Sequence, residues 1–132
     1  MERHVTEDLD RLIRLKVNQH YTGKKGGKTQ ERFYESCVRF IGFLIWRYHR
    51  SSDQQGRYQD AVMFARSEEG TMVDLGIQNP RRVRLFLMNH GILEPVIDEM
   101  GRDYSYRLEN KRARRYRVKI GESSVLPLTR LQ

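Results

Sequence analysis

The sequence predicts an α+β fold that is mostly helical and carries an antiparallel β-hairpin near its C-terminal end. Through roughly the first two thirds of the chain, apolar residues recur at helical spacing. Between 104 and 120 they alternate with polar residues, which is the period of a half-buried strand. The length of 132 residues suits a single domain. We expect it to comprise an N-terminal helical part (1–56), a core (57–120) and a tail (121–132).

The chain is strongly basic, which favours a polyanionic partner. Lys and Arg number 25 against 17 Asp and Glu, giving a formal net charge of +8. The surplus is concentrated in residues 101–120. The single cysteine, Cys37, excludes an internal disulfide and suits a reducing compartment. Because there is no signal-peptide pattern and no long apolar run, we expect a cytoplasmic or nucleoid-associated protein with no membrane partner.

Two helices are expected in the N-terminal part. Thr6 is the expected N-cap of an amphipathic helix over 7–20, because the two residues after it are acidic. Thr29 is expected to cap a second helix over about 30–49, whose wide apolar arc makes it the central core helix.

Two aromatic residues of this second helix fall outside its main apolar arc. They are Phe43 and Trp46, and they form a second apolar patch that something must cover. Either the first helix or the C-terminal tail packs on it, or the patch is the interface of a homodimer.

A basic loop joins the two helices. Its sequence, TGKKGGK followed by Thr29, ends like a phosphate-binding loop. The spacing is one residue short of G-x-x-x-x-G-K-S/T, however, and no strand precedes it. We therefore interpret 22–28 as a flexible loop, in which the candidates for contact with a nucleic-acid backbone are Lys24, Lys25 and Lys28.

The next two helices are expected to be short. One runs over about 57–68 and is stopped by Gly70. Thr71 and Asp74 then resemble a capping box, which would start a helix of little more than one turn. Gly76 ends that helix, because a turn between two helices requires a left-handed residue.

The following helix is expected to begin with Asn79 as its cap and Pro80 in its first position, and to run to about Asn89. Its core face is predicted to comprise Val83, Phe86, Leu87 and His90. Its opposite face is predicted to comprise Arg81, Arg84, Leu85, Met88 and Asn89, with Arg82 at the margin.

The C-terminal part is expected to form basic strands. A strand over 92–97, with Pro95 at a sheet edge, precedes two strands at 104–109 and 115–120 that are joined by a tip at 110–113. Apolar residues would cover one face of this hairpin and basic residues the other. The candidate phosphate contacts are Arg107, Lys111, Arg112, Arg114, Arg115, Arg117 and Lys119. A solvated charged face is the simpler interpretation of the same pattern.

The segment 57–120 resembles the winged helix-turn-helix superfamily of DNA-binding proteins. The likeness rests on LGIQNPRRVRLFLMNHGIL followed by the basic hairpin. A narrower likeness, of GIL and YSYRLENKRARRYRV, is to wing segments of phage and plasmid replication proteins. The resemblance implies a recognition helix at 80–90 in the major groove and a wing on the DNA backbone or in the minor groove. Base or near-base contacts would then come from Gln78, Asn79, Arg81, Arg84 and Asn89, with Arg82 on a phosphate.

No pattern in the sequence indicates an enzyme, a cofactor or a metal site. We therefore expect a non-enzymatic protein that binds duplex DNA as a homodimer, in transcription regulation or in replication or partition of a phage or plasmid. One alternative is an accessory protein that binds single-stranded DNA or RNA through stacking rings of Tyr104, Tyr106 and Tyr116. Another is a protein-interaction adaptor built on the same fold.

Overall fold

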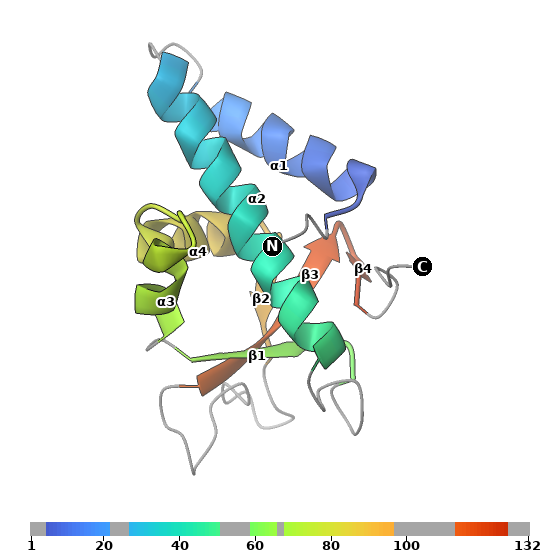
Figure 1. Ribbon diagram of the computed structural model, residues 1–132. Coiled ribbons are helices and arrows are strands. Elements are labelled where there is room, and N and C mark those ends of the chain that lie inside the picture. The colour runs from blue at the N-terminus through green and yellow to red at the C-terminus, as the bar shows by residue number, and fades with distance from the viewer. Residues whose placement is uncertain (1–4, 22–26, 51–58, 66–67, 97–112, 127–132) are drawn as a thin grey trace.

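The fold is α+β and mostly helical, with a small antiparallel sheet, as the sequence predicts (Figure 1). This is a computed structural model, and it describes residues 5–21, 27–50, 59–65, 68–96 and 113–126. The elements, in chain order, are α1 (Glu7–His20), α2 (Gly27–Arg50), β1 (Val62–Ala65), α3 (Glu69–Asp74), α4 (Pro80–Asn89), β2 (Leu93–Pro95), β3 (Ala113–Ile120) and β4 (Ser123–Ser124).

Helix α1 has the bounds that its cap and periodicity predict. The Thr6 side-chain oxygen accepts a hydrogen bond from the Leu9 N–H at 3.3 Å, which satisfies one free donor of the first turn. Helix α2 begins at Gly27, so the prediction that Thr29 caps it is wrong and Thr29 lies inside the first turn. Near its start α2 contacts α1, where Gln30 Nε2 donates to Asn18 Oδ1 at 2.7 Å.

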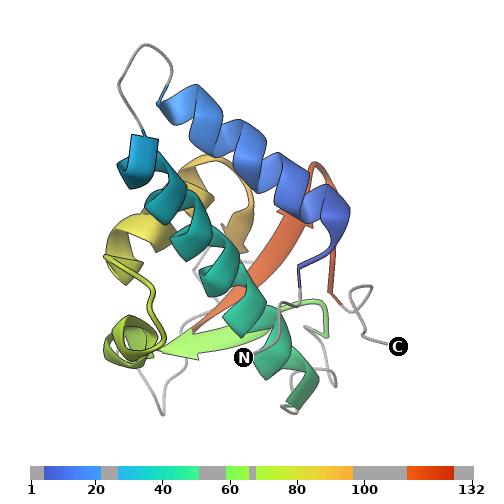
Figure 2. The same cartoon turned by 45° about the horizontal axis from the view of Figure 1, so that its top comes forward.

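Helix α2 is the central core helix, and Figures 1 and 2 show it crossing the molecule between α1, the sheet and α4. Phe43 is only 7% exposed and belongs to the core cluster, with its ring centroid 6.0 Å from that of the partly buried Trp46. The prediction of a dimer interface at Phe43 is therefore wrong, because the chain itself covers this side chain. Val125 and Leu126, from the predicted tail, are members of the same cluster.

The sheet has β3 at its centre, in the order β1-β3-β2, and β4 pairs with the far end of β3. The prediction of a helix over 57–68 is wrong where the structure describes that segment, because 62–65 is strand β1. Val62 and Phe64, two residues apart, are both buried, and the Phe64 ring packs edge-on against Phe40 of α2 at 5.4 Å. Pairing with β3 and packing on α2 together override the local helical pattern.

Strand β3 confirms the predicted alternation, since Tyr116 and Val118 are buried between less buried basic neighbours. Its described partners are β1, β2 and β4, all antiparallel. The expected partner strand, 104–109, lies outside the described residues, as does most of the predicted tip at 110–113. Among the described strands β2 lies at an edge of the sheet, which agrees with the position predicted for Pro95.

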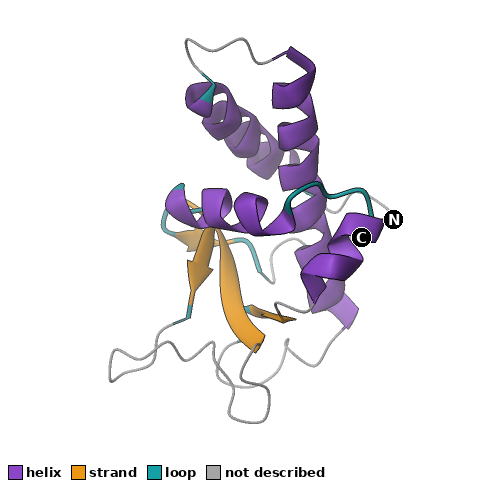
Figure 3. Cartoon of the chain, turned by 90° about the vertical axis from the view of Figure 1, so that its left-hand side faces the viewer, coloured by secondary structure: helices purple, strands orange, loops and turns teal. Residues whose placement is uncertain are grey.

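Helix α3 begins at Glu69, two residues before the predicted start, so Gly70 and Thr71 lie inside it and the capping-box prediction is wrong. Tertiary ion pairs set this boundary. Glu68, which precedes the helix, pairs with Arg47 of α2, and Glu69 pairs with Arg84 of α4. Figure 3 shows α3 lying beside α4, which crosses one end of the sheet.

Candidate nucleic-acid interface

The turn between α3 and α4 is held in place by α2. Gly76 adopts the predicted left-handed conformation, with φ of +85°. The Ser36 side chain of α2 is 3% exposed, and its oxygen accepts a hydrogen bond from the Gln78 N–H at 3.2 Å. Ile77, which lies between Gly76 and Gln78, is fully buried. As a result, the Gln78 and Asn79 side chains lie exposed where α4 begins.

Asn79 occupies the predicted N-cap position but does not cap through its side chain. Its backbone is left-handed, with φ of 48°, and its side chain makes no capping hydrogen bond. The Asn79 carbonyl oxygen instead accepts from the Val83 N–H at 3.0 Å. Pro80 holds the first helical position as predicted, where the missing N–H costs nothing. The Asn79 amide is therefore not used as a helix cap.

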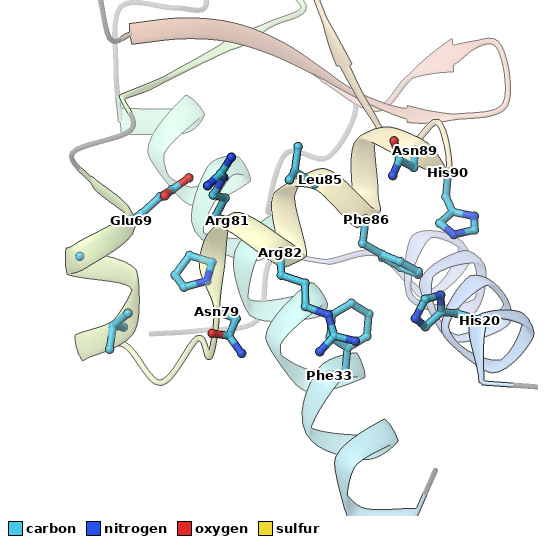
Figure 4. Close-up of a pocket in the computed structure, with 13 residues that line it drawn as sticks. His20, Phe33, Glu69, Asn79, Arg81, Arg82, Leu85, Phe86, Asn89 and His90 are labelled. Atoms are coloured by element: carbon cyan, nitrogen blue, oxygen red, sulfur yellow. The ribbon is translucent and has the colours of Figure 1, made fainter. Parts of the chain in front are cut away.

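Helix α4 presents an exposed polar face opposite its buried one. Val83, Phe86 and Leu87 are buried, as predicted. The exposed side chains are Arg81, Arg82, Leu85 and Asn89. Figure 4 shows Arg81, Leu85 and Asn89 following one another along the helix.

Arg84 does not belong to this face, and the prediction that it does is wrong. The residue is 8% exposed, and its Nε donates to Glu69 Oε1 of α3 at 3.0 Å. Residues advance by about 100° around a helix, so Arg84 follows Val83 at the edge of the buried stripe. Helix α3 packs on that edge. Arg84 is therefore a structural link between the two helices.

Arg82 lies over an aromatic cluster at the other edge of α4. Its guanidinium carbon is 4.8 Å from the centroid of the Phe33 ring, and Phe33 packs edge-on against Phe86 at 4.9 Å. Such a cation–π contact orients the guanidinium and leaves its charge unneutralised. The His90 ring packs against Phe86 and so belongs to the same cluster. Burial lowers the pKa of His90, and the positive charges of its neighbours lower it further.

A groove of about 760 Å³ runs along the exposed face of α4. Residues from α1, α2, α3 and α4 line it, as Figure 4 shows. Its lining combines apolar surface with cationic and amide side chains, and includes Phe33, Val73, Arg81, Arg82, Leu85 and Asn89. A surface of this mixed character can accept a charged partner that also offers apolar groups.

Basic residues of α2 extend the site beyond the N-terminus of α4. Lys28, Arg32 and Arg39 are exposed and line a hollow of about 370 Å³, together with Gln78 and the carboxylates of Glu31 and Glu35. Glu31 is paired with Arg14 of α1. The sequence-based prediction included Lys28 but missed Arg32 and Arg39. The sequence does indicate them, because Arg32 follows Lys28 by four residues and Arg39 follows Arg32 by seven, which places all three on one face of a helix. Lys24 and Lys25 lie outside the described residues.

The basic residues of β3 are less available than the sequence indicates. Arg117 Nε is 2.7 Å from Asp60 Oδ2, and Lys119 Nζ is 3.3 Å from Glu94 Oε2. Their side chains are 25% and 14% exposed. The prediction of a solvent-facing row of phosphate contacts is therefore wrong for Arg117 and Lys119, because both are neutralised within the fold.

The other hairpin candidates are only partly described. Arg115 is partly buried in β3, and the Arg114 side chain lies outside the described residues. The same is true of the whole of Arg107, Lys111 and Arg112. Their predicted contacts with phosphates stay predictions.

The single cysteine, Cys37, does not offer a reactive thiol. Cys37 is buried, and that burial raises the pKa of its thiol to about 12, so the reactive thiolate is suppressed at neutral pH. Among the described residues, no group of three or more His, Cys, Asp and Glu side chains is arranged to hold a metal ion. None of the described helices is long and apolar enough to cross a membrane.

Searches of protein-family models, curated proteins and solved structures found no match to this chain.

Proposed function

We propose that this protein binds duplex DNA as a winged helix-turn-helix protein, with α4 in the major groove. The order of the elements supports the proposal. Helix α3, the left-handed turn at Gly76 and α4 are followed by β2 and β3, an antiparallel pair joined through 97–112. In this proposal the wing is the basic hairpin predicted at 104–120, of which the structure describes β3.

The observation that carries the proposal is the exposed face of α4. Arg81 and Arg82 have no ion-pair partner within the described part of the chain. Arginine pairs with guanine in the major groove, and asparagine and glutamine pair with adenine. Asn79 and Asn89 supply such amides in the α4 groove, and Gln78 supplies one in the hollow beside the N-terminus of α4.

The exposed cations of α2 fit the same partner. Lys28, Arg32 and Arg39 lie next to the N-terminal end of α4, where a duplex in contact with that helix would bring its phosphates. They replace Arg84, Arg117 and Lys119 in the set of contacts that we propose.

Of the three tyrosines that would stack on a single strand, Tyr116 is 2% exposed and so is not available to a base, which supports duplex DNA. Tyr104 and Tyr106 lie outside the described residues. A protein-interaction adaptor is the second candidate, supported by the 56% exposed Val73 in the groove. For the cellular role we propose transcription regulation, or replication or partition of a phage or plasmid. A homodimer also stays a proposal, without the support of Phe43.

The test is fluorescence anisotropy of the full chain with a labelled duplex of random sequence, over a range of salt concentrations. Arg32→Ala and Arg39→Ala should weaken binding to all sequences and each lower the salt slope by about one unit. Arg81→Ala should instead reduce the preference among selected sequences, by about 1–3 kcal/mol if it pairs with guanine.

Arg11→Ala is the matched control, because Arg11 is an exposed arginine of α1 that pairs with Glu7 and lies outside the groove. It should leave duplex affinity unchanged. The proposal is wrong if the parent protein does not bind duplex DNA in about 0.1 M salt, or if the α2 and α4 variants bind as tightly as the parent. Competition by single-stranded DNA and RNA separates the alternative nucleic acids.

A further inference from the structure

Leu85 is an apolar side chain in the middle of the basic face of α4. It is 41% exposed and lines the groove. The core does not use it, because Val83, Phe86 and Leu87 supply the buried face of the helix. Arg81 and Asn89 lie four residues before and after it, so the three side chains follow one stripe of the helix.

The spacing of this stripe suits neighbouring base pairs. Four residues correspond to about 6 Å along a helix axis, which is roughly two base-pair steps of duplex DNA. A helix held in the groove by hydrogen bonds from Arg81 and Asn89 would therefore bring Leu85 against a base edge between the two.

The floor of the major groove offers one apolar group, the C5 methyl of thymine, among hydrogen-bond donors and acceptors. Leucine against that methyl removes apolar surface from water, which is favourable. Leucine against a polar base edge would strip water from a donor or acceptor without replacing its hydrogen bond, which is unfavourable. One side chain would thus favour thymine and disfavour the other bases.

We propose that Leu85 is a specificity-determining residue that selects duplexes with a thymine methyl at the centre of the α4 contact. This inference rests on the proposed binding of duplex DNA. The same side chain could meet a protein, but the charge around it favours DNA. Arg81 and Arg82 lie one helical turn before Leu85, and the nearby carboxylate of Glu69 is already paired with Arg84.

The test compares thymine with uracil, which differs only in lacking the methyl group. The probes are duplexes of 20 base pairs enriched by the full chain from a random library, and the same duplexes with deoxyuridine replacing each thymidine in turn. At one position or two adjacent positions, the replacement should weaken binding about fourfold, which corresponds to about 0.8 kcal/mol for one buried methyl group.

Leu85→Ala should bind the thymine and uracil duplexes equally. Leu15→Ala is the matched control, because Leu15 is a 51% exposed leucine of α1 that does not line the groove. This control should keep the fourfold difference. Both substitutions remove exposed side chains, so circular dichroism should show both variants folded.

The outcomes separate the inference from the proposed function. If the parent does not enrich any duplex, duplex binding itself is wrong and the inference falls with it. If the parent binds duplexes but no uracil replacement matters, or if Leu85→Ala keeps the discrimination, only the role of Leu85 is overturned. A change in sedimentation of Leu85→Ala with both affinities unchanged would instead assign Leu85 to a protein contact.

Discussion

Replacing Gly76 by alanine tests how the turn between α3 and α4 is built. With φ of +85°, this residue lies in the left-handed region, which costs an L-residue about 1–2 kcal/mol. An added Cβ would also overlap Nη1 of Arg39. Arg39 is exposed and flexible, so it can move at little cost. We therefore expect Gly76→Ala to lose about 1–2 kcal/mol of unfolding free energy, nearly all of it from the backbone.

Urea unfolding followed by circular dichroism measures this loss, and the melting temperature should fall by roughly 3–10 °C. Gly70→Ala is the matched control. Gly70 lies inside α3, and an added Cβ there would meet nothing within 4 Å. Alanine is the better helix former, so this change should stabilise the protein by about 0.5–1 kcal/mol. The two glycine-to-alanine changes thus have opposite expected signs.

Two further variants separate backbone strain from the steric overlap. Gly76→Asn should cost less than Gly76→Ala, because asparagine tolerates the left-handed region better. Adding Arg39→Ala to Gly76→Ala should restore little stability. Our account of the turn is refuted if Gly76→Ala unfolds at the same urea concentration as the parent, or if removing Arg39 restores the whole loss.

Two other predictions follow from the ionisable groups around α4. Arg84→Ala should lower the free energy of unfolding by roughly 2–4 kcal/mol in a urea titration, because it leaves the carboxylate of Glu69 unpaired and that side chain is only 19% exposed. Arg81→Ala should change the free energy of unfolding by less than about 0.5 kcal/mol. Equal losses for the two arginines would contradict the assignment of Arg84 as a structural link. His90 should titrate below its ordinary pKa of 6.5 in an NMR experiment, because burial, Lys16 and His20 all disfavour its charged form. The unfolded chain then binds the proton more tightly than the folded one, so stability should fall as the pH drops through about 6.5. His90→Asn should reduce that fall. An NMR titration midpoint of His90 at or above 6.5 would contradict this prediction.

The elements that the sequence predicts correctly carry their signals locally. Helix α1 has its cap at Thr6 and a regular apolar stripe, and α4 has Pro80 in its first position and a clear buried face. The left-handed turn at Gly76 is also a local property, because it depends on the absence of a side chain. In each case the information lies within a few residues of the feature.

The errors concern contacts between residues far apart in the chain. Strand β1 is short, and what makes it a strand is pairing with β3, as in the register of Val62 with Tyr116. The alternation of apolar and polar residues predicts that Tyr116 and Val118 face the core, but it does not predict which strands pair with β3. The early start of α3 likewise depends on Glu68 and Glu69 meeting arginines of other helices.

Contacts between residues far apart in the chain also decide which surface charges are available to a partner. Counting residues favours the C-terminal basic run as the main contact for a polyanion. In the described part of that run, however, Arg117 and Lys119 are already neutralised by Asp60 and Glu94, because β3 lies at the centre of the sheet. The arginines of α2 and α4 are fewer but exposed: Arg81 and Arg82 line the groove along α4, and Arg32 and Arg39 line the hollow beyond its N-terminus. The interface that we propose for a polyanion therefore depends on which charges the fold leaves unpaired, and among the described residues these are on α4 and the adjoining face of α2.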